Sequence, residues 1–129
     1  QVEALIAREL GRGIATRRIV VAGFSQGGVV ALHTGLRHAE RLAGIVALST
    51  YVVRPDLLAG EASAANRDVP IFMAHGTADP MIAIGRAQQS RKMLEALGYA
   101  VEWHEYPMAH SVCMAEIEDL NQWLNRVLA

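Results

Sequence analysis

The chain has little cysteine, little charge and no long apolar run, and each shortage excludes a class of protein. Its one cysteine, Cys113, cannot form a disulfide within the chain, which excludes a disulfide-held scaffold and is consistent with a reducing compartment. The 12 basic residues balance 13 acidic ones without clustering, so binding to nucleic acid or to a membrane surface has no electrostatic basis. Every apolar stretch is far shorter than the roughly 18 residues that a membrane-spanning helix needs. We therefore expect neither a nucleic-acid partner nor a membrane span.

The chain does have apolar material for one core. Apolar residues make up 52 % of its 129 residues, which predicts a single domain over residues 1–129. From the first turn they recur at helical spacing, at Val2, Leu5, Ile6 and Leu10. No initiator methionine, signal peptide pattern or helix-capping residue precedes them. This beginning predicts a chain that lacks the N-terminal part of a longer protein.

Helical and strand patterns alternate along the sequence. They predict helices over residues 1–11, 26–37, 85–97 and 111–128, a short helical turn at 55–58, and strands over 18–23, 44–49, 70–76 and 100–106. The first three strands are apolar without alternation, which is typical of strands buried on both faces, whereas the fourth alternates as an edge strand does. Such an order implies parallel pairing with right-handed crossovers. The predicted fold class is α/β, with about four parallel strands flanked by helices.

One motif suggests a chemistry. Gly23-Phe24-Ser25-Gln26-Gly27 matches the pattern G-x-S-x-G and lies between a predicted strand and a predicted helix. In that context a sharp turn lifts the serine hydroxyl clear of the backbone, and glycines are needed because a Cβ atom would collide with the turn. A glycine-rich loop with a helix-capping serine is the alternative interpretation. We take Ser25 as the candidate nucleophile.

Two further residues have the places of an acid and a base. A serine hydroxyl is a weak nucleophile until a base accepts its proton and a carboxylate orients that base. Asp79 follows the third predicted strand and His110 the fourth, beyond the strand ends where open α/β sheets place their sites. Serine, acid, histidine is also the chain order in hydrolases with this turn. We predict Asp79 as the acid and His110 as the base, with helix capping as the alternative role for His110.

Other polar residues are weaker candidates for the acid and the base. Four carboxylates are interpreted as loop caps or solvated strand positions: Asp56, Asp68, Glu102 and Glu105. Four histidines are interpreted as structural or surface residues: His33 and His38 as exposed, His75 as hydrogen-bonded beneath the acid loop, and His104 as a surface residue. No pair of histidines or cysteines has metal-ligand spacing, so no metal is expected.

The residues beside the three candidates are interpreted as pocket or core. Cys113 is interpreted as a small buried helix residue, because no strained turn presents it as a nucleophile. Met81, Met108 and Met114 either line an acyl pocket or pack in the core. The candidates for the substrate pocket are Phe24, Met81, Met108, Ser111 and Val112.

Four ordered blocks resemble one family. They are GFSQGG (23–28), LSTY (48–51), HGTADP (75–80) and EYPMAHSVCMAEI (105–117), and together they are similar to small bacterial carboxylesterases related to acyl-protein thioesterases and lysophospholipases. The resemblance implies a partial α/β-hydrolase fold in the cytoplasm. It implies cofactor-free hydrolysis of short- to medium-chain carboxylic esters, or of thioesters, with a small-molecule ester as substrate. It gives Ser25, Asp79 and His110 the triad roles and the backbone N–H of Gln26 the role of an oxyanion donor.

The sequence departs from this family in one respect. The family's first strands, and the HG-type loop that supplies the second oxyanion donor, have no counterpart here. Loss of one donor lowers the rate by a factor on the order of 10²–10³. The missing neighbour would also leave residues 18–23 as an apolar edge, which we expect a second copy of the chain or a rearranged N-terminal segment to cover. The alternatives to a carboxylesterase are an acyl-protein thioesterase or lysophospholipase, and an inactive remnant that acts as an association module.

Overall fold

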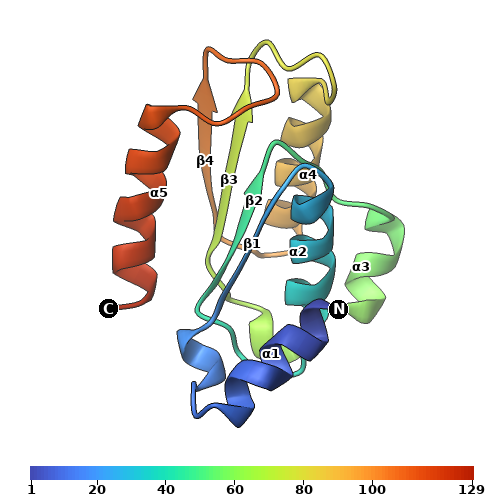
Figure 1. Ribbon diagram of the computed structural model, residues 1–129. Helices are drawn as coiled ribbons and strands as arrows, with labels where there is room; N and C mark the ends of the chain where they lie inside the picture. The colour runs from blue at the N-terminus through green and yellow to red at the C-terminus, as the bar shows by residue number, and fades with distance from the viewer.

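A computed structural model describes residues 1–129 as one parallel sheet with helices on both faces (Figure 1). The strands are β1 (Val20–Phe24), β2 (Gly44–Leu48), β3 (Ile71–Gly76) and β4 (Val101–Tyr106). They lie in the order β1-β2-β3-β4, and each neighbouring pair is parallel. The predicted α/β class and parallel sheet are therefore confirmed.

Five α-helices connect and cover the strands. They are α1 (Val2–Gly11), α2 (Gln26–Arg37), α3 (Pro55–Glu61), α4 (Ile84–Ala96) and α5 (Met114–Val127), with short 3₁₀ helices η1 (Thr16–Arg18) and η2 (Ala64–Asn66). Figure 1 shows α5 on one face of the sheet and α2 and α4 on the other. No helix is both long enough and apolar enough to cross a bilayer.

Three predicted boundaries were wrong. The strand expected from residue 18 begins at Val20, because residues 16–18 form η1. The turn expected at residues 55–58 continues as a helix to Glu61. The helix expected from residue 111 begins at Met114. The last difference matters most, because the residues before Met114 belong to the loop that carries His110.

Two apolar clusters fill the two faces of the sheet. On the α2 and α4 side, Leu32, Leu36 and Leu94 pack with Ile45 and Met73. On the α5 side the buried members are Val46, Leu48, Phe72, Ala74, Tyr106 and Trp123. Strands β2 and β3 are buried along their whole length, as their unalternated sequences predicted.

The inward face of α5 differs from the one that helical periodicity over residues 111–128 predicts, which includes Val112, Ala115 and Ile117. Trp123 lies tightly against Gly44, where a Cβ atom would overlap the indole ring. This contact sets the rotation of the helix, so Ala115 and Ile117 are exposed, and Val112, which precedes the helix, is exposed as well. The residues that do face the sheet are Glu116, Leu120, Trp123, Leu124 and Val127. A carboxyl group thus occupies the first position of the buried stripe.

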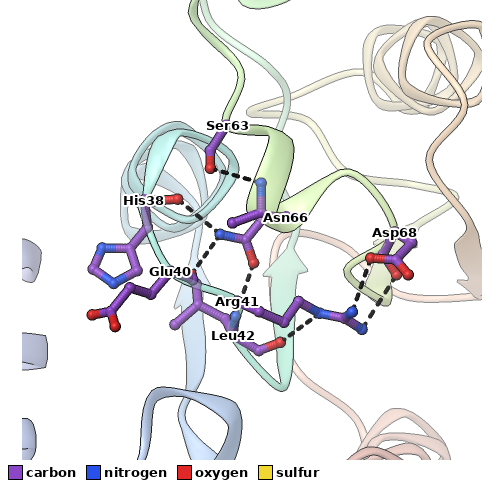
Figure 2. Close-up of polar contacts among 8 residues, drawn as sticks. His38, Glu40, Arg41, Leu42, Ser63, Asn66 and Asp68 are labelled. Atoms are coloured by element: carbon purple, nitrogen blue, oxygen red, sulfur yellow. Dashed lines mark hydrogen bonds and ion pairs between the residues drawn. The ribbon is translucent and has the colours of Figure 1, made fainter.

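The connection between α2 and β2 is fastened by one buried amide (Figure 2). Asn66 is fully buried; its Nδ2 donates to the carbonyls of His38 and Glu40, at 2.9 and 2.8 Å, and its Oδ1 accepts from Leu42 N–H at 2.8 Å. His38 itself is 7 % exposed, and its Nδ1 lies 2.9 Å from a carboxylate oxygen of Glu3. The prediction that His38 is exposed was wrong, because α1 packs over the end of α2.

Strand β1 forms one edge of the sheet. The carbonyl of Ile19 accepts from the N–H of Ala43, just before β2, and the N–H of Ser25 donates to the carbonyl of Leu48, at the end of β2. Because the direction of backbone groups alternates along a strand, those of Val20, Ala22 and Phe24 point away from the sheet. A groove of about 290 Å³ runs between this edge and α1, and seven of its eight lining residues are apolar. Leu5, one of the apolar residues at helical spacing in α1, lies in this groove and is 59 % exposed.

Candidate active site

Ser25 lies on a strained turn between β1 and α2. Its backbone has φ 57° and ψ −119°, a conformation that an L-residue adopts only when its surroundings hold it there. Two hydrogen bonds do so: Ser25 N–H donates to Leu48 O at 2.8 Å, and the hydroxyl of Thr50 donates to Ser25 O at 2.7 Å. The turn ends the strand and starts the helix at Gln26, which leaves the Ser25 hydroxyl at the carboxyl end of the sheet.

Gly23, two residues before the serine, is required by close packing. A Cβ atom on Gly23 would overlap the carbonyl group of Gly27, and one on Gly28 would overlap the side chain of Thr50. Gly27 has open space around it. Of the two glycines in the G-x-S-x-G pattern, only Gly23 is therefore explained by steric contact.

Asp79 is held in the loop after β3. Its Oδ1 accepts from the N–H groups of Met81 and Ile82, at 2.8 and 2.9 Å, which leaves Oδ2 free to face His110. Burial alone would raise the pKa of Asp79, but the Ile82 N–H, the His110 ring and the Met81 N–H together hold it below its usual value. Asp79 is therefore an ionised hydrogen-bond acceptor whose side chain is buried, although most of the loop around it is exposed.

His110 joins the other two residues. Its Nδ1 lies 2.7 Å from Asp79 Oδ2 and its Nε2 lies 2.9 Å from Ser25 Oγ. With the proton on Nδ1, the ring donates to the carboxylate and accepts from the serine hydroxyl. This arrangement can take a proton from the hydroxyl and stabilise the resulting imidazolium. The structure thus brings together three residues that are spread over 85 positions of the sequence, from Ser25 to His110.

The loops that carry the acid and the base are joined directly. Thr77 N–H donates to Tyr106 O at 2.9 Å, and Ala78 N–H donates to Met108 O at 3.1 Å. The second loop passes so close to Gly76 that a Cβ atom there would overlap the carbonyls of Met108 and Ala109. These contacts fix the separation of Asp79 and His110.

The remaining site candidates lie around the three residues with different exposure. Gln26 is the first residue of α2, so its N–H has no acceptor one turn back within the helix. The Phe24 ring lies 4.9 Å from the His110 ring, centroid to centroid, and is partly exposed. Met108 packs against the α5-side cluster. Met81, Ser111 and Val112 are exposed, as is Met114.

The weaker candidates are not part of this arrangement. Asp56 pairs with Arg54, and Asp68 pairs with Arg41. Glu105 is exposed, while Glu102 is paired with His104 at 2.8 Å. His33 is exposed, as predicted.

Three further residues that the sequence analysis interpreted as structural are His75, His104 and Cys113. His75 is completely buried; its Nε2 lies 2.7 Å from Ile82 O and 3.4 Å from Asp79 Oδ2, so it packs beneath the acid loop as predicted. His104 is only partly exposed and stacks on Phe72, so it is not a simple surface residue. Cys113 is the partly exposed N-cap of α5 and not a buried helix residue.

Sequence reasoning missed two residues near the site. Thr50 holds the carbonyl of Ser25, and only its place directly after a buried strand could have indicated this role. Glu116 is completely buried within α5. No signal in the sequence marked this acidic side chain as buried.

Comparisons with known proteins agree with this geometry. A four-stranded parallel sheet with a strained serine after one strand, an acid after another and a histidine after a third defines part of an α/β-hydrolase fold. Residues 1–128 match the model of the phospholipase/carboxylesterase family, and the chain belongs to that family.

Similar proteins include acyl-protein thioesterases. The chain is 40 % identical to acyl-protein thioesterase 1 of Neurospora crassa, over 96 % of this chain and 52 % of that protein. It is 40 % identical to acyl-protein thioesterase 1 of Yarrowia lipolytica, over 96 % and 56 % respectively. The chain thus spans about half the length of these relatives.

Solved structures show the same fold. Arabidopsis thaliana SOBER1 superposes with a TM-score of 0.93 at 28 % identity, covering 99 % of this chain and 61 % of that one. Zea mays acyl-protein thioesterase 2 superposes with a TM-score of 0.85 at 26 % identity, covering 98 % and 63 %. The fold is therefore a partial α/β-hydrolase fold, as the resemblance implied.

Proposed function

We propose that Ser25, Asp79 and His110 are the catalytic triad of a serine hydrolase that cleaves acyl esters or thioesters. The observation that carries this proposal is the pair of contacts at His110, 2.9 Å to Ser25 Oγ and 2.7 Å to Asp79 Oδ2. Distances of this length are those expected between a nucleophile, its base and the group that orients the base.

The reaction proceeds in two halves. Ser25 Oγ attacks the acyl carbonyl while its proton passes to His110 Nε2, and Asp79 stabilises the imidazolium. The tetrahedral intermediate collapses, His110 returns the proton to the departing alcohol or thiol, and the acyl group stays on Ser25. Water then attacks the acyl-enzyme, its proton passes to His110, and the carboxylic acid leaves as Ser25 regains a proton.

The developing oxyanion is stabilised by the Gln26 N–H. This group has no acceptor within α2, and it follows the nucleophile directly. The partial positive charge at the start of α2 adds to its effect. We assign no second donor within this chain, so its turnover is expected to be lower than that of a hydrolase with two donors.

The family resemblance favours a short- to medium-chain acyl group, and Phe24 and Met108 are the residues proposed to contact it. Esters and thioesters are both candidates, because the same triad serves either leaving group and relatives of this chain are named acyl-protein thioesterases. Parallel assays with p-nitrophenyl esters and acyl-coenzyme A thioesters, each from two to twelve carbons, measure the preference. A kcat/KM at least about tenfold higher for thioesters than for esters would indicate that the chain is a thioesterase.

A fluorophosphonate probe tests the nucleophile. We expect one covalent adduct on Ser25, found by mass spectrometry, and none in Ser25→Ala. Cys113→Ser is the matched control, since Cys113 lies in the His110 loop and should label as the parent chain does. An adduct on Cys113 or Ser111 would disprove the assignment. A folded chain without any adduct would instead favour an inactive module that binds other chains.

A further inference from the structure

Glu116 occupies a core position that the proposed chemistry does not use. It lies in the first turn of α5, and its side chain is completely buried against the sheet. The residues that follow it on the same stripe, Leu120, Trp123, Leu124 and Val127, are all apolar. A leucine would therefore suit the packing at this position better than a carboxyl group does.

The carboxyl group is poorly hydrogen-bonded. Both oxygens of Glu116 are shielded from solvent and make no hydrogen bond of ordinary geometry, and the donor that acts on them is the Cys113 N–H. The groups facing it are the Tyr106 side chain from β4, whose hydroxyl donates to Asp119 at 2.6 Å, and Cys113. No cationic side chain lies close enough to affect it. A buried charge without a partner is costly, so the neutral acid is the form that suits this position.

Burial raises the pKa of Glu116, and the Cys113 N–H opposes that rise without outweighing it. Both forms of the carboxyl group can accept from the Cys113 N–H, but the carboxylate also places an unpaired charge in the core. Protonation therefore lets Glu116 stay buried beside the start of α5, whereas ionisation favours its exposure to water.

The position of Glu116 ties this chemistry to the base. Cys113 is the N-cap of α5 and Glu116 is the third residue after it, which is the spacing of a capping box. In that motif the acidic side chain reaches back toward the N-cap N–H. Cys113 makes no capping bond of its own. His110 lies three residues before this N-cap, and the backbone hydrogen bonds that join its segment to the acid loop all lie before it, at Tyr106 and Met108. Glu116 therefore lies where the far end of the His110 loop must be held.

We propose that Glu116 is a positioning residue for His110: as a neutral carboxylic acid it holds the start of α5 against the sheet, and its ionisation loosens the loop that carries the base. This inference rests on the proposed function of His110. Loss of the proton from Glu116 should therefore lower the rate as pH rises.

Steady-state kinetics of three variants tests the role. Glu116→Gln keeps the size and hydrogen-bonding capacity of the neutral acid, so its kcat at neutral pH should stay within about threefold of the parent chain. Its kcat should also lack the fall that the parent shows as pH rises. Glu116→Ala should lower kcat about tenfold with KM changed less than about twofold, because it removes the anchor and not substrate contacts. Glu118→Ala, an exposed glutamate in the same turn, is the matched control and should match the parent.

Urea unfolding between pH 5 and 9 supplies a readout that needs no turnover. Because the folded pKa is raised above 4.5, the unfolded chain releases this proton first, and stability falls as pH rises toward the folded value. Glu116→Gln should have a flatter profile. If the parent chain reacts with the fluorophosphonate at Ser25 but has the same unfolding profile as Glu116→Gln, the role of Glu116 is overturned. A parent with the steeper profile but no adduct on Ser25 would overturn the proposed function instead.

Discussion

The acid of the candidate site follows a strand with neighbours on both sides, whereas the nucleophile follows an edge strand. Asp79 follows β3, which pairs with β2 and β4, and its loop is bonded to the loop of His110. Ser25 follows β1, which pairs only with β2 and leaves its other edge beside an apolar groove. The turn at Ser25 nevertheless keeps its strained backbone, because Leu48 and Thr50 hold it from the β2 side.

This difference shows which parts of the site depend on this chain alone. The arrangement of Ser25, Asp79 and His110 comes from contacts among the four strands and their loops, so it forms within these 129 residues. The open edge of β1 has no neighbouring strand and lies at the strand that leads to Ser25. Variants on the two sides should therefore differ in kind: one set affects the chemical step, and the other affects association.

The largest effect is expected at the acid. Asp79→Asn keeps the shape of the side chain but presents an amide to His110, so kcat should fall by about 10⁴-fold while the fold is retained. Because the pKa of Asp79 is lowered in the fold, the stability it contributes is present at neutral pH and is lost as pH falls below about 4, a dependence that the variant should lack. Asp68→Asn, in an exposed ion pair, is the control. A loss of less than tenfold would place the orienting carboxylate elsewhere.

The next effect concerns the joint between the two loops. Gly76→Ala adds a Cβ atom where the Met108 and Ala109 carbonyls lie, so the His110 loop must move away from Asp79. We expect a loss of about 1–3 kcal/mol in the free energy of unfolding and a kcat at least about tenfold lower. Gly85→Ala, where nothing lies within 4 Å of the added atom, should show neither change. Unaltered kinetics in Gly76→Ala would mean that the contact between the loops does not set the geometry.

An intermediate effect is expected at the open edge. We propose that a second copy of the chain covers β1, because its unpaired backbone and apolar groove favour association. Sedimentation velocity over a dilution series should show a dimer for the parent chain. Ala22→Lys places a charge on the exposed edge and should weaken association at least about tenfold, while Ala96→Lys on α4 should not. A monomer at every concentration, with undiminished ester turnover, would show that no partner is needed.

The smallest effect is expected far from the site. Glu3→Gln removes the carboxylate that faces the buried His38, but Glu3 itself is largely exposed. We expect the free energy of unfolding to fall by less than about 1 kcal/mol, with kcat unchanged. Urea unfolding at pH 6 measures the difference. A larger loss would show that α1 is more firmly attached to α2 than its single buried apolar residue, Ile6, suggests.

Local pattern was sufficient for much of the fold. The unalternated strands at Ile45 and Phe72 predicted burial on both faces, and the alternation around Trp103 predicted an edge. The positions of Ser25, Asp79 and His110 at strand ends predicted that they would meet, because parallel strands bring their carboxyl ends to one side of a sheet. These inferences needed only periodicity and chain order.

Other features depended on contacts between segments distant in the sequence. The inward face of α5 was set by Trp123 packing on Gly44, which rotated Glu116 into the core and Ile117 out of it. The burial of His38 required α1 to lie over the end of α2. Hydrophobic periodicity defines a stripe on a helix only to within one residue, because neighbouring positions differ by about 100°. Amino-acid sequence determined which elements form and in what order, and tertiary packing decided which side of each element is buried.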